Sequence, residues 1–280
     1  MQKTFKIDTA EISRGISNFS IGFASLSVKD NVEDATSAGS GSLVTVGSLY
    51  GVLTAAHVVD ALPKSGHVGI ISYIENSMQF QRQSIAMEHA GCLTIQGKEF
   101  GRNGPDLGFL RLPQDNVGWL KAKNSFYNLS KHRDDALAHR AAGQGHVDTV
   151  VGVIHELTKD LPSEKRGVRK KGFTGIFCGG RPSAIRYRDD FDILDFEPTS
   201  DAEFGLPNSF EGTSGGAIWR FFVTEKDNKP LVVERRLIGV PFYQSLAADK
   251  KRIITYHGPK SIYGVLIDRI IARWPEEASK

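Results

Sequence analysis

Short apolar runs of strand length, separated by turn residues, recur along most of this chain. In several runs apolar and polar side chains alternate, as expected for a strand with one buried face. The clearest alternation spans residues 20–28, and residues 41–46 and 51–54 flank a short turn that predicts a hairpin. Further strand candidates are residues 68–73, 109–112, 147–154, 193–196, 217–223, 231–233 and 237–242, with a turn at 226–230. The 29 glycines among 280 residues favour many tight turns over long helices.

Helical periodicity is clear in only one place, near the end of the chain. Ile267, Ile270, Ile271 and Trp274 follow the spacing of one helix face. A weaker helical pattern covers residues 118–130. Many short strands with few helices predict an all-β protein built from antiparallel barrels or a sandwich, rather than from alternating strands and helices.

Charge and apolar content exclude several classes of protein. The formal net charge is +3, from 35 basic and 32 acidic residues, so no nucleic-acid partner is expected. The basic stretch 165–171 is interpreted as a solvated loop, with a nucleic-acid patch as the alternative. The longest apolar runs are far shorter than a membrane span, and residues 1–30 show no apolar core of a signal peptide. We therefore expect a cytoplasmic protein that does not bind membranes.

The chain contains two cysteines, Cys92 and Cys178, too few for a disulfide framework and without the spacing of a zinc site. They agree with a reducing compartment. No metal and no cofactor are expected.

Three segments carry residue types that can act together in catalysis. Residues 54–59 end an apolar strand and contain His57, residues 104–112 place Asp106 at the start of a strand, and residues 211–219 surround Ser214 with glycines. Each segment also has a purely structural interpretation: a half-buried histidine, a Pro-Asp turn and a flexible glycine loop. Motifs of this size are hypotheses when taken singly.

Taken together, the three segments supply the parts of a nucleophilic mechanism. A serine hydroxyl is a weak nucleophile until a base removes its proton, and neutral imidazole suits that task near pH 7. A carboxylate on the other ring nitrogen fixes the tautomer and stabilises the imidazolium. Backbone N–H groups in a glycine-rich loop can approach the oxyanion that develops in the transition state.

The order of the three residues discriminates between folds. Residues 212–216 also satisfy the G-x-S-x-G pattern of α/β-hydrolases, in which the acid and then the histidine follow the serine. After Ser214 the only histidine is His257, and the flanking residues do not show the strand–turn–helix pattern. The order His57, Asp106, Ser214 is instead that of chymotrypsin. An esterase on the α/β-hydrolase fold is the less favoured alternative.

On these segments the chain resembles the chymotrypsin-fold, trypsin-like serine peptidases, in particular the bacterial type without disulfides. Residues 54–57 resemble the histidine motif of that family, residues 106–112 its aspartate strand and residues 212–216 its serine loop. The resemblance extends over about residues 19–274.

The resemblance implies a single peptidase domain over residues 1–280, made of two six-stranded antiparallel Greek-key β-barrels and a C-terminal helix. The first barrel would span about 19–112, a linker about 113–144, and the second barrel with the helix about 145–275. In this arrangement His57, Asp106 and Ser214 are the catalytic triad. The backbone N–H groups of Gly212 and Ser214 form the oxyanion hole.

Two positions depart from the secreted members of that family. The residue before the nucleophile is Thr213, where zymogen-activated members carry an aspartate that pairs with a newly formed N-terminus. A neutral hydroxyl cannot form this ion pair, so we expect that N-terminal cleavage does not activate the protein. The position at the base of the S1 pocket is Asn208, which argues against a strong preference for basic residues.

The resemblance also places Phe242, Tyr243 and Gln244 on the side wall of the S1 pocket, on a strand edge that can hold a substrate backbone. His257 has two interpretations: a pocket residue that favours acidic P1 side chains, or an ordinary turn histidine.

The sequence thus predicts an intracellular serine endopeptidase that acts through an acyl-enzyme on a protein or peptide substrate. Because an unrestrained protease is harmful in a cell, a dedicated regulatory protein partner is an additional expectation. A catalytically weak peptide-binding module on the same fold is the alternative.

Overall fold

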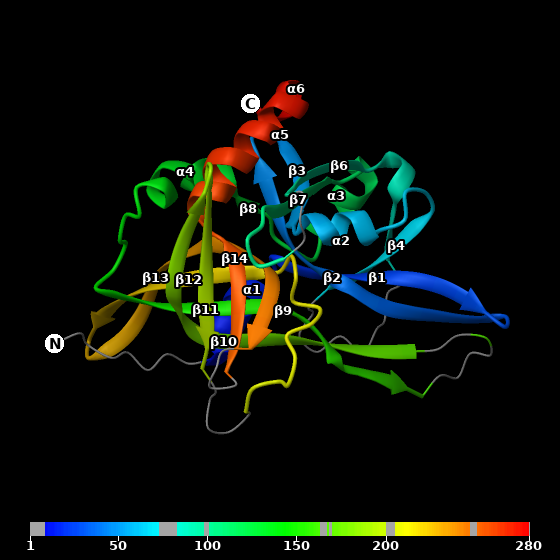
Figure 1. Cartoon of the computed structure of the whole chain (residues 1–280), viewed down its shortest axis with the longest axis horizontal. Coiled ribbons are helices and arrows are strands. Elements are labelled where there is room, and N and C mark those ends of the chain that lie inside the picture. The colour runs from blue at the N-terminus through cyan, green and yellow to red at the C-terminus, as the bar shows by residue number, and fades with distance from the viewer. Residues whose placement is uncertain are drawn as a thin grey trace.

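The computed structural model describes residues 9–72, 83–97, 101–162, 167, 170–199, 205–246 and 251–279. As the alternating pattern predicts, the protein is mainly β-structure, arranged in two sheets with a helix near the C-terminus (Figure 1). All strand pairs are antiparallel except a two-residue parallel pair between β2 and β8. The antiparallel sheets argue against the parallel-sheet α/β-hydrolase fold.

The first sheet contains eight strands and is open in the described part of the chain. Its order is β5-β4-β1-β2-β3-β7-β6, with β8 paired to β2. The strands are β1 (Ser20–Lys29), β2 (Val32–Val46), β3 (Leu49–Thr54), β4 (His67–Ser72), β5 (Ser84–Ala86), β6 (Gly91–Gln96), β7 (Asp106–Arg111) and β8 (Tyr127–Asn128). A closed six-stranded first barrel is therefore not what the structure shows. The short β5 occupies the place beside β4 where a closing strand would lie, and β6 alternates between exposed and part-buried residues as an edge strand does.

The second sheet is a closed six-stranded barrel, as predicted for this half of the chain. Its strands follow the order β10-β11-β14-β13-β12-β9 and β9 pairs again with β10. They are β9 (Gly145–Leu161), β10 (Lys170–Arg188), β11 (Phe191–Pro198), β12 (Ala217–Lys226), β13 (Lys229–Leu246) and β14 (Arg252–His257). The predicted turn at 226–230 joins β12 to β13, with Asp227 and Asn228 both at positive φ, as in the tight turns of hairpins.

The two sheets share a strand order. In each, three consecutive strands lie side by side, β1-β2-β3 and β9-β10-β11. The neighbour of the third strand comes from later in the chain, β7 in the first sheet and β14 in the second. The next strand in each sheet is the one that comes just before it in the chain. This is β6 beside β7 in the first sheet and β13 beside β14 in the second.

Several local predictions differ from the structure. Residues 231–233 and 237–242 belong to one long strand, β13, rather than to two. The helix predicted over 118–130 is wrong, because this region contains the end of α3 (Gln114–Lys121), the strand β8 and the start of α4 (Leu129–Leu137). Asn128 caps α4 by accepting a hydrogen bond from the N–H of Lys131. The basic stretch 165–171 falls largely outside the described residues, but Lys171 lies on β10.

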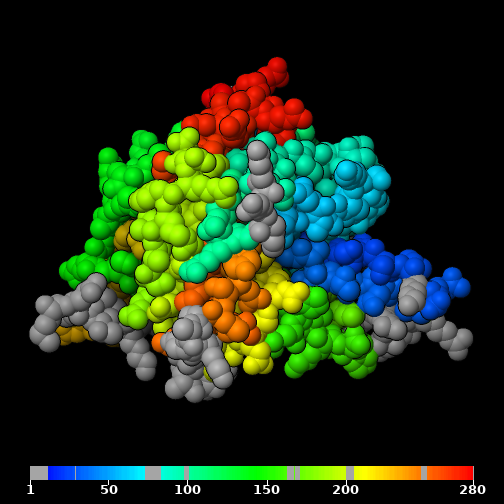
Figure 2. Space-filling view, in the orientation of Figure 1, coloured from blue at the N-terminus to red at the C-terminus, as the bar shows by residue number. Residues whose placement is uncertain are grey.

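The C-terminal helix is confirmed and lies across both halves of the molecule. A π-helical turn (Lys260–Leu266) leads into α5 (Ile267–Arg273) and α6 (Pro275–Ala278). Ile267 and Ile270 are buried, and the Trp274 ring lies 5.8 Å from that of Phe109 on β7. Figure 2 shows this segment, in red, at the top of the molecule above both sheets. The other helices of the described residues are α1 (Thr9–Ser17), α2 (Ala56–Ala61) and the 3₁₀ helix η1 (Met87–His89). Within the described ranges no helix combines the length and apolar character needed to cross a bilayer.

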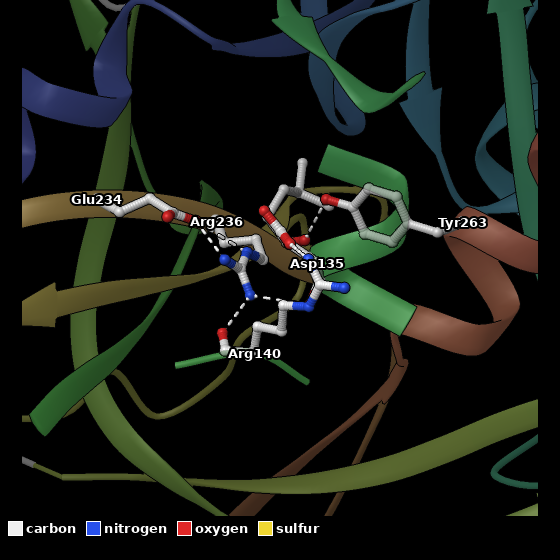
Figure 3. Close-up of polar contacts among 6 residues, drawn as sticks. Asp135, Arg140, Glu234, Arg236 and Tyr263 are labelled. Carbon is white, nitrogen blue, oxygen red and sulfur yellow. Dashed lines mark hydrogen bonds and ion pairs between the residues drawn. The ribbon is translucent and has the colours of Figure 1, made fainter. Parts of the chain in front are cut away.

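A buried arginine binds the segment that contains the end of α4 to the second barrel (Figure 3). Arg236 on β13 is only 3% exposed, and its Nη1 donates to the carbonyl oxygens of Asp135 (3.1 Å) and Arg140 (2.7 Å) at the end of α4. Its Nε donates to Glu234 (2.9 Å). Nearby, the Tyr263 hydroxyl of the C-terminal segment donates to the Leu237 carbonyl. The arginine thus binds two carbonyl groups at the end of α4, of which that of Asp135 also accepts from the N–H of Arg140 at 3.0 Å.

Candidate active site

His57 lies in the first turn of α2, directly after β3. The two preceding residues, Ala55 and Ala56, are completely buried, while the imidazole is 27% exposed. β3 ends at the buried Thr54, whose Oγ1 donates to the carbonyl oxygen of Ser40 on β2 at 2.7 Å. Small buried side chains therefore keep this turn close to the sheet, and the histidine is the first residue that reaches partly into solvent.

Asp106 is the first residue of β7, and its carboxylate holds His57 through two hydrogen bonds. Its Oδ2 is 2.6 Å from His57 Nδ1, and the backbone N–H of His57 donates to Oδ1 at 2.9 Å. The two residues meet because β3 and β7 are paired, with Thr54 opposite Gly108. An ionised carboxylate can only accept, so Nδ1 carries the proton and Nε2 is the basic nitrogen of the neutral ring.

The loop that carries Ser214 packs directly against the turn that carries His57. The carbonyl of Ser214 accepts from the N–H of Ser40 at 2.8 Å. Gly215 has φ +79°, and a Cβ there would lie 1.9 Å from Thr54 Oγ1 and 2.9 Å from the backbone nitrogen of Ala55. Only glycine fits so close to the neighbouring chain. The structure thus brings the three predicted catalytic segments together.

Two backbone N–H groups of this loop have no acceptor. The N–H groups of Thr213, Gly215 and Gly216 donate to the carbonyls of Phe210, Pro241 and Thr213 at 2.7–3.1 Å. Those of Gly212 and Ser214 donate to no residue in the described part of the chain. Gly212 has φ +95°, and a Cβ there would lie 2.8 Å from the carbonyl oxygen of Val153. These two N–H groups are the ones the sequence predicts for an oxyanion hole.

The residue before Ser214 uses its side chain inside the loop. Thr213 is buried, and its Oγ1 donates to the carbonyl of Phe210 at 2.7 Å. The side chain of Thr213 therefore forms a hydrogen bond within its own loop, at the position where a zymogen-type peptidase would need an ion pair.

His257 lies in the interior behind Asp106, at the end of β14. Its ring is completely buried and stacks on Phe242 with 4.6 Å between ring centroids. The backbone N–H of Asp106 donates to His257 Nε2 at 2.9 Å, and His257 Nδ1 is 3.3 Å from Ser261 Oγ. Burial lowers the pKa of His257 to about 4, so the ring is neutral at pH 7. Neither sequence interpretation of His257 anticipates this contact with Asp106, because the two residues are far apart in the chain.

The other residues assigned to the S1 pocket lie at different depths. Phe242 is buried and Tyr243 is partly buried, and both pack in the apolar cluster of the first sheet. Asn208 is exposed, and its N–H donates to Glu156. Gln244 reaches the loop before Ser214, accepting from the N–H of Phe210 and donating to Ser209 Oγ, both at 2.9 Å. The structure thus brings Gln244 to the loop, but not Asn208 and His257 to a common surface.

One edge of β13 ends its pairing beside the serine loop. β12 pairs with β13 only as far as Gly239, while residues 243–246 pair in the sheet with β14 alone. The carbonyl of Pro241, between these stretches, accepts from the N–H of Gly215. This edge resembles the strand edges to which extended peptides add.

The two cysteines form no disulfide in the described part of the chain. Both are free, and burial raises the pKa of Cys178 to about 11, so its thiol is protonated and a poor nucleophile. Within the described ranges no group of three or more His, Cys, Asp or Glu side chains is arranged to hold a metal ion.

Comparison with known proteins does not assign this chain. No protein-family model matches it, and the search of curated proteins found no match.

Proposed function

We propose that this protein is a serine endopeptidase of the chymotrypsin-fold type, which hydrolyses peptide bonds through an acyl-enzyme. The observation that carries the proposal is the pairing of His57 with Asp106 at 2.6 Å next to a serine loop with two N–H groups that have no acceptor among the described residues. The repeated strand order of the two sheets supports the Greek-key part of the proposal.

In this mechanism Ser214 Oγ attacks the scissile carbonyl carbon while His57 Nε2 accepts the hydroxyl proton. The imidazolium that forms is stabilised by Asp106, and it then donates the proton to the leaving amine. Water hydrolyses the acyl-enzyme in the second half of the reaction, with His57 again as base. The N–H groups of Gly212 and Ser214 stabilise the oxyanion in both halves.

The substrate of this reaction is a protein or peptide in extended conformation. The end of β13 beyond its pairing with β12 lies beside the serine loop, where the Pro241 carbonyl accepts from the N–H of Gly215, and supports the addition of such a strand next to Ser214. The buried, self-contained contact of Thr213 supports activity without N-terminal cleavage. Two free cysteines fit the reducing cytoplasm that the composition predicts. Control by a dedicated protein partner is part of the same proposal.

Labelling with a fluorophosphonate probe tests the proposal, because the probe reacts with an activated serine without requiring knowledge of the substrate. We expect a single adduct on Ser214, located by peptide mass spectrometry, and no adduct in His57→Ala. The matched control is His155→Ala, since the N–H of His155 donates to Glu211 in the same loop, while its half-exposed ring lies 3.9 Å from the Glu211 carboxylate and takes no part in the pairing of His57 with Asp106.

Failure of wild-type labelling in every condition, including with added peptide, would favour a peptide-binding module. A labelled protein can then be profiled with a peptide library, and Ser214→Ala should lose turnover by several orders of magnitude.

A further inference from the structure

Ser40, on β2 of the first sheet, makes four hydrogen bonds around the serine loop. Its backbone N–H donates to the carbonyl of Ser214 (2.8 Å), and its carbonyl accepts from Thr54 Oγ1 (2.7 Å). Its hydroxyl donates to the carbonyl of Gly212 (2.7 Å) and accepts from the N–H of Val153 on β9 (2.8 Å). Ser40 is 1% exposed. One small side chain therefore connects both sheets to the loop that contains the nucleophile.

The hydroxyl of Ser40 fixes the orientation of the peptide group after Gly212. A glycine at φ +95° has few conformational restraints of its own, so the orientation of this peptide plane depends on its hydrogen bonds. On one side the N–H of Thr213 donates to the carbonyl of Phe210 at 3.1 Å, and on the other side the Gly212 carbonyl accepts from Ser40. The hydroxyl supplies that contact by holding the Gly212 carbonyl toward the interior. The N–H groups of Gly212 and Ser214 lie in the peptide groups on either side of this plane, and among the described residues they have no acceptor, as an oxyanion hole requires.

The contact is closely packed as well as hydrogen-bonded. A Cβ on Gly152 of β9 would lie 3.1 Å from Ser40 Oγ and 2.8 Å from the Cα of Thr213. Loss of the hydroxyl would leave the Gly212 carbonyl and the Val153 N–H without their partner in a buried place. A buried polar group without a partner destabilises the local conformation, so the loop is expected to rearrange.

We propose that Ser40 is a positioning residue that keeps the oxyanion hole assembled in the newly folded chain, in the role that an activating ion pair has in zymogen-type peptidases. The inference rests on the proposed function for its catalytic consequence. We call the two hydrogen bonds of the Ser40 hydroxyl, to the Gly212 carbonyl and from the Val153 N–H, the clamp. The effect of the clamp on the loop can be tested separately from catalysis.

The test compares Ser40→Ala with Ser42→Ala. Ser42 lies two residues further along β2, on the same face of the strand, and is equally buried, but its hydroxyl has no hydrogen-bond partner. Both variants remove one buried hydroxyl from the same strand, so only the contact with the loop differs. Ser40→Cys, which fills nearly the same volume with a weak donor, serves if Ser40→Ala does not fold.

Two measurements are made on each variant. The first is the rate constant for fluorophosphonate labelling, together with kcat and KM for a small ester substrate. We expect Ser40→Ala to lower labelling and kcat by about 100- to 1000-fold with KM within about twofold, as for loss of an oxyanion-hole donor, and Ser42→Ala to stay within about twofold of wild type. The second is amide hydrogen exchange over residues 210–216, expected to be at least about tenfold faster in Ser40→Ala than in Ser42→Ala.

The outcomes separate the two proposals. If folded Ser40→Ala matches Ser42→Ala in both measurements, the positioning role is refuted. If exchange accelerates while labelling and kcat are unchanged, the clamp exists but the oxyanion hole does not depend on it, and the positioning role is again refuted. If the wild type is not labelled at all, the peptidase proposal fails, and the exchange comparison alone decides whether Ser40 holds the loop.

Discussion

The buried ring of His257 gives the protein a built-in sensitivity to acid. In the folded protein burial holds the pKa of this ring at about 4, although the nearby Asp106 and Asp192 favour the charged form. In the unfolded chain the pKa returns to about 6.5. Between these values the unfolded chain binds more protons than the folded one, so the free energy of unfolding falls as the pH is lowered through this window.

The magnitude follows from the difference between the two pKa values. The two pKa values differ by about 2.5 units. When the pH has fallen to the folded pKa and His257 is charged in the unfolded chain, the free energy of unfolding has decreased by roughly 3 kcal/mol. The destabilisation is absent above about pH 7.5, and most of it, about 2 to 3 kcal/mol, is present at pH 4.5. The protonated ring could not accept the N–H of Asp106, so the same titration also removes the acceptor of that N–H.

The variant His257→Gln separates this effect from the titration of carboxylates. Its amide oxygen can accept the N–H of Asp106, but the side chain does not titrate. Urea unfolding, followed by fluorescence of the buried Trp219, gives the free energy of unfolding of both proteins at pH 7.5, 6.0 and 4.5. We expect the wild type to lose about 2 to 3 kcal/mol more than His257→Gln over this range. Parallel pH dependences, within about 0.5 kcal/mol, would refute the assignment of a buried neutral ring to His257.

Three further substitutions test other parts of the structure. Asp106→Asn should lower kcat by about 10⁴-fold in ester hydrolysis with unchanged thermal unfolding, because the amide favours the wrong tautomer of His57; a loss below about tenfold would contradict the orienting role. Gly215→Ala should lower the free energy of unfolding in urea by more than about 2 kcal/mol, since its Cβ would meet Thr54 Oγ1 and the Ser40 carbonyl oxygen. Gly118→Ala on α3, which has open space around it, should instead raise the free energy of unfolding by up to about 1 kcal/mol. Equal effects of the two variants would argue against the close approach at Gly215. Arg236→Met should destabilise the protein by about 2–3 kcal/mol in the same assay, since it removes the donor that the carbonyls of Asp135 and Arg140 share; a change within 0.5 kcal/mol would show that α4 does not depend on this contact.

Strand prediction succeeded where one face of a strand is buried and failed where local pattern is weak. The alternation over 20–28 corresponds to β1, and the glycine turn at 47–48 forms the predicted hairpin between β2 and β3. β10 was not predicted, although it has 19 residues, because its glycines and basic residues interrupt any regular period. It is a strand because β9 and β11 pair with it on either side, and such pairing is not visible in a local window.

The first sheet illustrates a second limit of sequence reasoning. Two barrels were expected on the resemblance, but only the second sheet closes in the described residues. Closure depends on whether the edge strands reach each other, and this is set by strand tilt and register over the whole sheet. No residue pattern within β5 or β6 contains that information.

The residue pattern was sufficient to predict the β-rich class, the C-terminal helix and the three segments that can provide base, acid and nucleophile. Local chemistry was sufficient for this, because periodicity, turn residues and side-chain types are properties of neighbouring positions. The tertiary structure alone decided that Asp106 faces His57 and that His257 supports Asp106 from the second barrel. It alone also placed the Ser40 hydroxyl on the Gly212 carbonyl, 172 positions away. These contacts join distant parts of the chain, and they exist only because sheet pairing and barrel closure bring those parts within hydrogen-bonding distance.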